Sequence, residues 1–234
     1  MTRAKLPSLV AVVAIALTIA AAAPDASAQG AAAQRRPPVP PAPPSPAVSV
    51  RGFGDVGGTV FTASNSFEAI LGSASGVIYG GGAEVVLRQG WFFSGRVARF
   101  TNDGQRVFVS NGEVFELGID TTITITPIEF TGGYRFTAPR RRLIPYIGGG
   151  VGMYGYREES EFATTDEDGD DSFTSYHLLA GAEYRIARWF GVAGEVQWAT
   201  VPDAIGQEPS SVGSAFDETD LGGTTFRVKV VFGL

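Results

Sequence analysis

The chain has 234 residues, a formal net charge of −6 and no cysteine. Without cysteine the protein can form neither a disulfide framework nor a thiolate metal site, and its acidic balance argues against a nucleic-acid partner. Glycine is abundant, at 31 residues, and has no collagen-like period, so it is expected where strands curve and side chains crowd.

The N-terminal segment, residues 1–28, has the pattern of a secretory signal peptide. Two basic residues precede an apolar run over residues 9–23, and Ala26-Ser27-Ala28 forms a small-residue cleavage site. The run is shorter than the about 20 apolar residues that a spanning helix needs, so an uncleaved anchor is the less favoured alternative. No second long apolar run follows it.

A proline-rich segment over residues 29–47 predicts an extended, solvated linker. A spacer is favoured over a ligand for another protein, because proline stretches of this kind recur as linkers. The folded domain is therefore expected over residues 48–234, with the linker leading into its first strand.

Eight segments after residue 48 alternate apolar and polar side chains, a pattern that predicts β-strands. The predicted strands cover residues 50–62, 77–88, 91 onward, 121–136, 144–157, 173–186, 189–200 and 226–234. The connections after the second, fourth and sixth strands are short, whereas the others are long and polar. Short turns at one end and long loops at the other are typical of membrane barrels. The predicted fold class is all-β, an eight-stranded antiparallel up-and-down transmembrane β-barrel.

Two features modify the third and fourth strands. Asn111-Gly112 between apolar residues is a strong hairpin signal, and it predicts that residues 106–116 rise as a hairpin from the second long loop. Along the fourth strand, the apolar face carries Ile123 and Ile125 and then changes parity at Pro127. A change of parity at a proline predicts a β-bulge there.

The last strand indicates which face meets lipid. Arg227 and Lys229 share one face, and the other face is apolar without interruption. The residues predicted to face lipid are Phe226, Val228, Val230, Phe232 and Leu234. A strand is stable in a bilayer only if all of its backbone groups are paired, which requires a closed barrel. Trp91 and Trp189 both follow short turns, which predicts an aromatic girdle at that end.

Ionisable residues collect on the strand faces opposite to the predicted lipid face. The predicted interior charge network consists of Glu84, Arg96, Glu129, Glu183, Arg185, Glu195, Arg227 and Lys229. We expect the glutamates to pair with the bases, because Arg or Lys facing hydrocarbon at the midplane costs about 2–4 kcal/mol. Whether Arg51 and Arg135 face the lumen or the barrel end stays open. The interior of an eight-stranded barrel is just wide enough for side chains to fill, which predicts a plugged interior.

Residues 158–171 contain eight acidic side chains. Asp166, Asp168 and Asp170 are weak candidates for Ca²⁺ ligands, but their spacing does not match the helix–loop–helix calcium motif, so a solvated acidic loop is favoured. His177 is the only histidine and is expected as an interior polar side chain, because no nucleophile, base and orienting group can be assembled around it. We therefore expect no enzyme activity, no cofactor and no metal.

The signal peptide, the eight alternating strands and the alternation of short turns with long loops together resemble the small outer-membrane barrels of the OmpA/opacity type, the porin family barrel domain. Residues 144–152, Ile-Pro-Tyr-Ile-Gly-Gly-Gly-Val-Gly, are similar to the fifth-strand segment of that family. The resemblance covers residues 48–234. It implies a place in the bacterial outer membrane with a periplasmic N-terminus, outer-membrane lipid around the barrel, and the barrel-assembly machinery as partner during biogenesis. Members usually end in phenylalanine, whereas this chain ends in Leu234.

Three functions are compatible with this fold. The favoured one is a structural or surface-interaction protein of the cell envelope, with a plugged polar interior, long extracellular loops and an extracellular ligand that the sequence does not identify. The alternative is a narrow, porin-like channel for small solutes or ions. A third is a soluble secreted barrel that binds a lipid. The interior charges count against the second and third functions, because a ligand cavity is mostly apolar.

Overall fold

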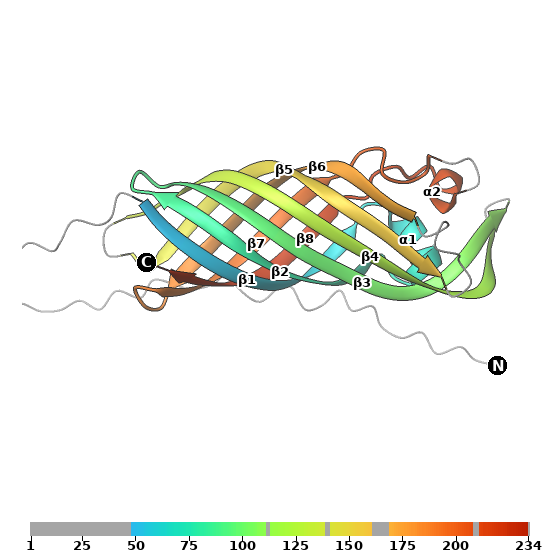
Figure 1. The fold of residues 1–234 in the computed structure, drawn as a ribbon, viewed down its shortest axis with the longest axis horizontal. Helices are drawn as coiled ribbons and strands as arrows, with labels where there is room; N and C mark the ends of the chain where they lie inside the picture. Colours follow the sequence, from blue (N-terminus) through green and yellow to red (C-terminus); the bar gives the residue numbers. More distant parts are fainter. Residues whose placement is uncertain (1–47, 111–112, 139–140, 161–168, 208–210, 234) are drawn as a thin grey trace, which may run out of the picture. The chain divides into compact units, whose positions relative to one another are not determined.

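The chain forms a closed eight-stranded barrel (Figure 1). The structure, a computed structural model, describes residues 48–110, 113–138, 141–160, 169–207 and 211–233. Each strand is antiparallel to the next, and β1 also pairs with β8, which closes the sheet and leaves no unpaired edge. The strands are β1 Val48–Phe61, β2 Ser75–Leu87, β3 Trp91–Ser110, β4 Glu113–Arg135, β5 Leu143–Ser160, β6 Gly169–Arg185, β7 Phe190–Thr200 and β8 Gly223–Gly233. The predicted fold class is confirmed.

The two ends of the barrel differ in their connections. The turns β2–β3, β4–β5 and β6–β7 gather at one end, together with the start of β1 and the end of β8 (Figure 1). We call this the short-turn end, and we call the opposite end, where the longer connections lie, the long-loop end. The predicted signal peptide, residues 1–28, and linker, residues 29–47, lie outside the described residues.

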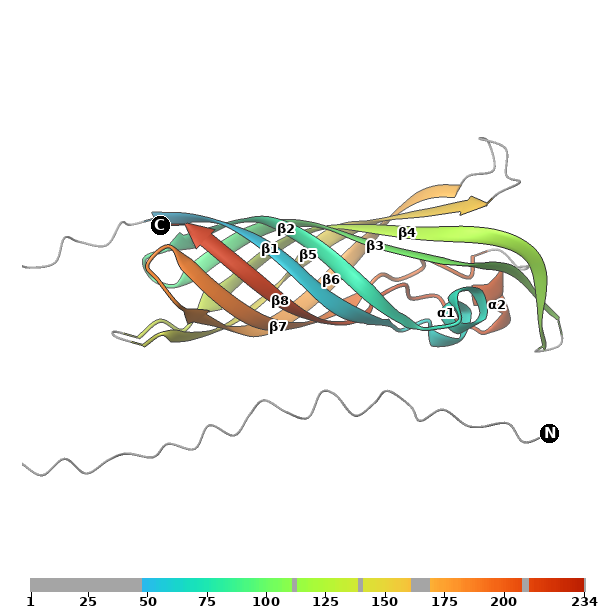
Figure 2. The ribbon, with the colours of Figure 1, turned by 90° about the horizontal axis from the view of Figure 1, so that it is seen from below.

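Strands β3 and β4 extend beyond their neighbours as a hairpin. Their pairing continues past a register shift between Gln105 and Val107 to the pair Ser110–Glu113. Figure 2 shows this hairpin curving away at the long-loop end. Only the Asn-Gly dipeptide 111–112 separates the last paired residues. The predicted hairpin is confirmed, with the two-residue connection that Asn-Gly favours.

The predicted bulge at Pro127 is wrong. The pairing of β4 with β5 runs without a shift from residue 121 to residue 135. Ile125, Pro127 and Glu129 are all buried, so inward and outward side chains alternate without interruption. What changes at Pro127 is the kind of side chain in the lumen. The inward side chains are charged toward the short-turn end and apolar toward the long-loop end.

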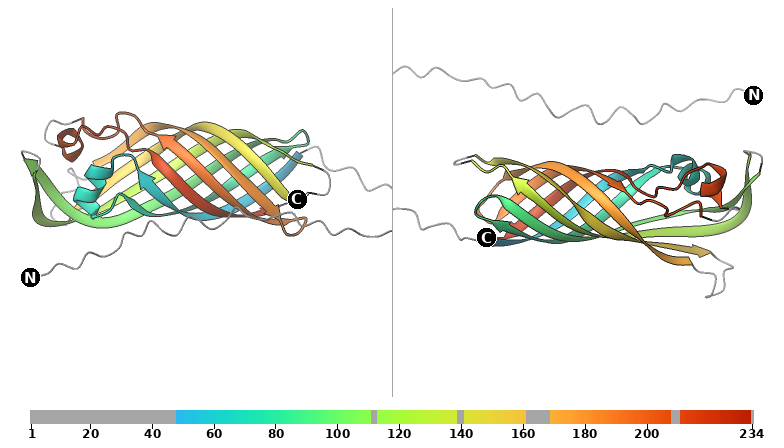
Figure 3. Two further views of the ribbon diagram at one scale, coloured as in Figure 1. Left: turned by 180° about the vertical axis from the view of Figure 1, so that it is seen from behind. Right: turned by 90° about the horizontal axis from the view of Figure 1, so that it is seen from above.

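Two short helices, which the sequence did not predict, lie at the long-loop end (Figure 3). Helix α1 spans Ser64–Leu71 between β1 and β2, and α2 spans Val212–Ala215 between β7 and β8. Helix α1 ends at Gly72, whose φ of 71° is left-handed and favours glycine. In the described part of the chain, no helix has the length and hydropathy needed to cross a membrane.

Helix α1 packs an aromatic side chain into the long-loop end of the lumen. Phe67 is buried, and its ring stacks on Phe61 of β1 with 4.1 Å between the ring centroids. Phe61 in turn meets the ring of Phe100 of β3 edge-on at 5.0 Å. Aromatic pairs of this kind contribute about 0.5–1.5 kcal/mol each beyond the burial of their area. Packing therefore holds α1 in place, which a helix this short requires.

Candidate functional site in the barrel lumen

The outer and inner faces of the barrel wall have opposite chemistry, as β8 shows. Three of the side chains predicted to face lipid are about half exposed, namely Phe226, Val228 and Phe232. Val230 is partly exposed, and Leu234 lies outside the described residues. On the opposite face, Arg227 and Lys229 are each only 6% exposed. A barrel wall with apolar side chains outside and charged ones inside fits a lipid bilayer.

Four charged side chains near the short-turn end form a closed set of ion pairs, the first charge set. They are Arg51, Glu84, Arg135 and Glu183, and all four are buried. Arg51 contacts Glu84 and lies 3.0 Å from Glu183. Arg135 pairs with Glu183 and lies 3.7 Å from Glu84. Each carboxylate therefore meets two guanidinium groups, and the set carries no net charge.

Six more charged side chains lie further along the lumen and form the second charge set. They are Asp55, Arg96, Glu129, Glu195, Arg227 and Lys229. Arg96 lies 2.6 Å from Asp55 and 3.0 Å from Glu129. Arg227 contacts Glu195 and lies 4.0 Å from Glu129. Lys229 lies 3.4 Å from Glu195. Acids and bases again balance, so the two sets together are neutral.

Neutral polar side chains add hydrogen bonds to the second charge set. The Tyr146 hydroxyl donates to Glu195 at 2.9 Å. His177 Nε2 lies 2.9 Å from Thr131 Oγ1, and both residues are buried, so the lone histidine lies inside the lumen. Such bonds matter because a buried charge set stabilises a fold only when its members are satisfied.

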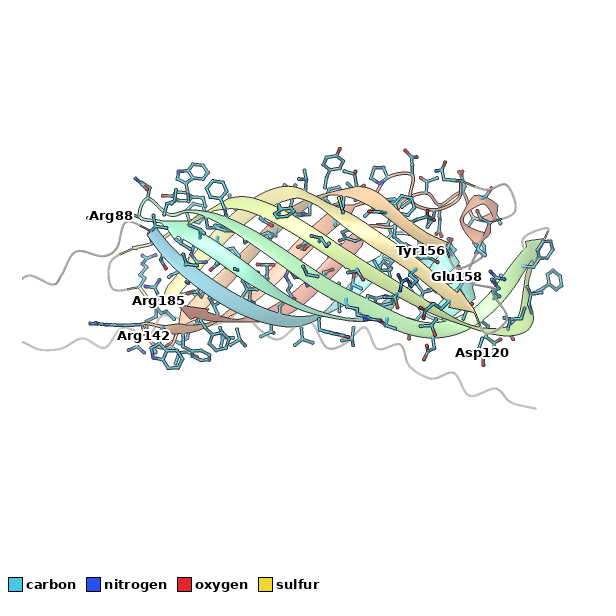
Figure 4. All side chains as sticks on the ribbon, viewed as in Figure 1. Arg88, Asp120, Arg142, Tyr156, Glu158 and Arg185 are labelled. Atoms are coloured by element: carbon cyan, nitrogen blue, oxygen red, sulfur yellow. The ribbon has the colours of Figure 1, made fainter. Side chains whose placement is uncertain are left out.

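The prediction for Arg185 is wrong. This side chain is exposed, because Arg185 is the last residue of β6 and lies at the short-turn end of the barrel (Figure 4). Its neighbour on the same face, Glu183, pairs instead with Arg51 and Arg135. The other seven side chains of the predicted network all lie in the two charge sets.

Sequence reasoning missed Asp55 and left Arg51 and Arg135 open. For Asp55 and Arg51, the alternation of side chains along β1 contained the information needed to place them. Val56 is 54% exposed on the outer face of β1, and Arg51 and Asp55 have the opposite parity to it. Counting alternation from Val56 would have placed both inside, and the abundance of glycine in this strand concealed the pattern.

From Pro127 toward the long-loop end the lumen is apolar, and the outer surface of β3 and β4 is polar. The apolar set in the lumen includes Phe61, Phe67, Ile78, Phe100, Ile123, Ile125, Tyr154, Val201 and Leu221. On the outside of β3 and β4, the Thr122 hydroxyl donates to Asp103 at 2.8 Å, and Arg99 donates to Thr101 at 3.1 Å. On β3 and β4 the pattern of charged side chains inside and apolar ones outside therefore ends near Pro127. On β1 and β2 the outer face stays apolar toward the long-loop end, where Val60, Val77 and Tyr79 are 49%, 63% and 54% exposed.

Comparison with known proteins supports this architecture. Neisserial surface protein A shares 9% identity with the chain at a TM-score of 0.50, over 80% of this chain and 97% of its own. The chain has the fold of the small outer-membrane barrels. Two further barrels align with lower TM-scores. The N-terminal domain of Pseudomonas aeruginosa OprF has 13% identity, a TM-score of 0.43 and coverage of 79% and 97%. Ail of Yersinia pestis has 12% identity, a TM-score of 0.46 and coverage of 79% and 98%.

No protein-family model and no curated protein sequence matches the chain. The likeness to Neisserial surface protein A concerns the fold alone, so support for a role comes from the side chains of the chain itself.

Two cavities lie in the lumen and at its long-loop end. A cavity of about 20 Å³ lies beside Ile125 and Tyr154, which is room for one water, because a water needs about 10–15 Å³. A second cavity, of about 500 Å³, lies at the long-loop end between α1, the β3–β4 hairpin and the segment before β8. Phe67 lines it, together with the ion pair of Arg106 and Glu158 at 3.4 Å.

The calcium hypothesis concerns a segment whose side chains the structure does not describe. Asp166 and Asp168 lie outside the described residues, and the same holds for the side chain of Asp170. Among the side chains that are described, no group of three or more His, Asp or Glu is arranged to hold a metal ion. The hypothesis stays a prediction.

Proposed function

We propose that the protein is an integral barrel of the bacterial outer membrane with a closed lumen, and that its role is structural or one of surface contact through its long-loop end. The observation that supports this proposal is that two kinds of side chain, charged and apolar, follow one another along the lumen. The charge sets fill one part, the apolar set fills the next, and a cavity of about 20 Å³ lies at the junction. Ion passage needs a continuous path of water, so this filling disfavours the channel.

The outer surface supports a place in lipid. Trp91 and Trp189, at the short-turn end, are 53% and 59% exposed. Tyr176 and Trp198, where β6 and β7 approach the long-loop end, are each 52% exposed. Aromatic side chains gather at both boundaries of a membrane-spanning barrel. Short turns face the periplasm in such proteins, so the proposal places the N-terminus there, with outer-membrane lipid around the wall and the barrel-assembly machinery acting during biogenesis.

A role in surface contact is supported by apolar side chains away from the lipid-facing wall. Phe108 and Phe115 face each other across the hairpin and are 50% and 47% exposed. Leu117, two residues on, is 53% exposed and also lines the cavity of about 500 Å³. Grouped apolar side chains in water are typical of contact sites. An enzyme is disfavoured, because His177 pairs with Thr131 in the closed lumen, where no substrate has access.

Conductance across a planar bilayer tests the closed lumen. The protein, refolded in detergent and shown to be folded by its faster gel mobility before boiling, is added to a bilayer in salt. We expect a current at the level of the protein-free bilayer. Discrete, reproducible current steps from the folded protein would overturn the closed lumen and favour the narrow channel.

Labelling of single cysteines tests the orientation, since the chain has no cysteine of its own. Phe115→Cys places a thiol on the exposed hairpin, and Gln89→Cys places one in the exposed β2–β3 turn. A membrane-impermeant maleimide is expected to label the first variant in intact cells and the second only after the outer membrane is opened. The reverse pattern would place the long-loop end in the periplasm.

A further inference from the structure

Charge on the outside of the protein is divided between its two ends. Five arginines that the structure describes, Arg88, Arg141, Arg142, Arg185 and Arg188, lie in or beside the three short turns, and the sequence has no Asp or Glu in the turn segments 88–90, 136–142 and 186–189. The long connections carry many acids, among them Glu68, Asp203, Asp217, Glu218 and Asp220. We call these five arginines the arginine rim. Arg88, Arg142 and Arg185 lie together at this end in Figure 4.

The described members of the arginine rim are exposed and have no acidic partner. They are Arg88, Arg141, Arg142, Arg185 and Arg188. None of them forms an ion pair with another side chain that the structure describes. This contrasts with the arginines of the lumen, each of which meets at least one carboxylate. The rim therefore presents a positive surface that nothing in the described barrel neutralises.

The backbone spreads these arginines around the barrel end. The Arg185 amide donates to the Arg142 carbonyl at 2.8 Å, which joins the β4–β5 and β6–β7 connections. Arg188 lies in a turn closed by two hydrogen bonds to the Phe190 carbonyl, at 3.1 and 3.0 Å. Arg88 belongs to the third turn, which the Gly90 amide closes on the Leu87 carbonyl. Each short turn thus contributes to one basic surface.

The arginine rim lies beside exposed aromatic side chains. Trp91 follows the turn of Arg88 and packs edge-on against Tyr134 at 5.4 Å, and Trp189 directly follows Arg188. Trp and Tyr of membrane proteins lie at the level of lipid headgroups. Arginines next to them in the chain are therefore within reach of the headgroup phosphates.

We propose that the arginine rim binds the phosphate groups of anionic phospholipids in the leaflet at the short-turn end. A guanidinium binds phosphate with two parallel hydrogen bonds, and basic side chains next to a membrane attract anionic lipid. This inference rests on the proposed membrane location and adds a lipid class to it. The occupant is a phospholipid, because the adjoining wall is apolar. The acids at the opposite end repel anions, so the preference is confined to one leaflet.

Quenching of tryptophan fluorescence by brominated lipids tests this proposal. Two of the three tryptophans, Trp91 and Trp189, lie beside the arginine rim and report on the lipid there. Trp198→Phe removes the third. The protein is reconstituted into phosphatidylcholine vesicles with increasing fractions of brominated phosphatidylglycerol or brominated phosphatidylcholine. We expect the anionic lipid to quench Trp91 and Trp189 with an apparent association constant about threefold higher or more, since one engaged basic residue contributes up to about fivefold.

Matched variants assign the preference to the rim. Arg142→Gln/Arg188→Gln removes two rim arginines and is expected to bring the ratio of association constants close to one. Arg99→Gln/Arg157→Gln removes two exposed arginines from the other part of the barrel and is expected to leave the ratio unchanged. The proposal is contradicted if the ratio of association constants stays unchanged in the Arg142→Gln/Arg188→Gln variant, or if it decreases equally in both variants.

The outcomes separate this inference from the proposed function. Equal quenching by the two lipids overturns lipid selection by the rim while showing that the barrel is inserted. No quenching by either lipid overturns the membrane location itself.

Discussion

At the level of single residues, Arg96 joins two carboxylates of the second charge set. It lies 2.6 Å from Asp55 and 3.0 Å from Glu129, so Arg96→Ala leaves two buried carboxylates without their nearest cation. Removing one partner of a buried pair costs about 3–5 kcal/mol. We expect a decrease of that size in the free energy of unfolding, measured by urea titration in lipid vesicles with gel mobility as the readout.

Arg99→Ala is the matched control for this prediction. Arg99 belongs to the same strand but faces outward, is exposed, and donates a hydrogen bond to Thr101 at 3.1 Å. Surface substitutions of this kind change stability by about 0.5 kcal/mol or less. Equal unfolding midpoints for the two variants would show that the charge set does not contribute to stability.

The lumen residues show what alternation can predict and where it stops. The alternation of side chains along a strand is enough to place Glu84, Glu129 and Glu195 inside, because an ionised side chain that faces lipid is destabilising. Parity does not say where a strand leaves the lumen. Arg185 has inward parity, but it is the last residue of its strand, so its side chain has access to water and needs no partner inside.

At the level of elements, helix α1 depends on a residue from a distant loop. No side chain caps α1 at Ala63. Instead, one oxygen of the Glu218 carboxylate accepts from the Asn65 amide at 3.0 Å, and the other accepts from the Ser66 amide at 2.8 Å. Burial raises the pKa of Glu218, but the hydrogen bonds from Ser66 and Asn65 outweigh it, so this pKa lies below its usual value.

The lowered pKa predicts how α1 responds to acid. A carboxylate whose folded-state pKa is below the unfolded one stabilises the fold above the unfolded pKa, and this contribution is lost as the pH falls through the folded pKa. We expect hydrogen-exchange protection of the α1 amides to decrease over that interval. Glu218→Gln should remove the dependence and lower protection at neutral pH by an amount equal to about 0.5–1 kcal/mol. The exposed Glu68→Gln is the control, and an equal effect of both variants would refute the capping role.

Comparison of helix α1 with the strands explains why the sequence predicted the strands but not the helices. All eight strands were found from the sequence, because alternation is a local signal that each strand carries by itself. Helix α1 has a helical spacing of Phe67, Ile70 and Leu71, but eight residues are too few for that pattern to predict a helix. Phe67 of α1 packs on Phe61, which is near in the chain but belongs to β1, and Glu218 bonds the α1 amides from a segment 152 residues away from Ser66. Only the three-dimensional structure brings them together.

At the level of the whole molecule, one continuous wall changes its chemistry from end to end. On β4, Phe130 faces outward and Glu129 inward, whereas nearer the long-loop end Thr124 faces outward and the buried Ile125 inward. The sequence shows this change as a shift of the apolar residues from one parity to the other. A bulge and a change in the side chains on the two faces both produce such a shift, and the unbroken register rules out the bulge.

Two chemistries in series predict that the lumen opens only when both are disrupted. Phe67→Ala removes the ring that packs on Phe61, at a cost of about 3–5 kcal/mol, but it leaves the charge sets intact. Arg51→Ala/Glu84→Ala/Arg96→Ala/Glu129→Ala removes one cation and one anion from each charge set and leaves the apolar set intact. We expect neither variant to conduct in a planar bilayer and the variant that combines all five substitutions to show discrete ion currents, with all three retaining heat-modifiable gel mobility. Conductance in the Phe67→Ala variant alone would mean that the charge sets do not close the lumen, and absence of current from the folded combined variant would mean that other side chains close it.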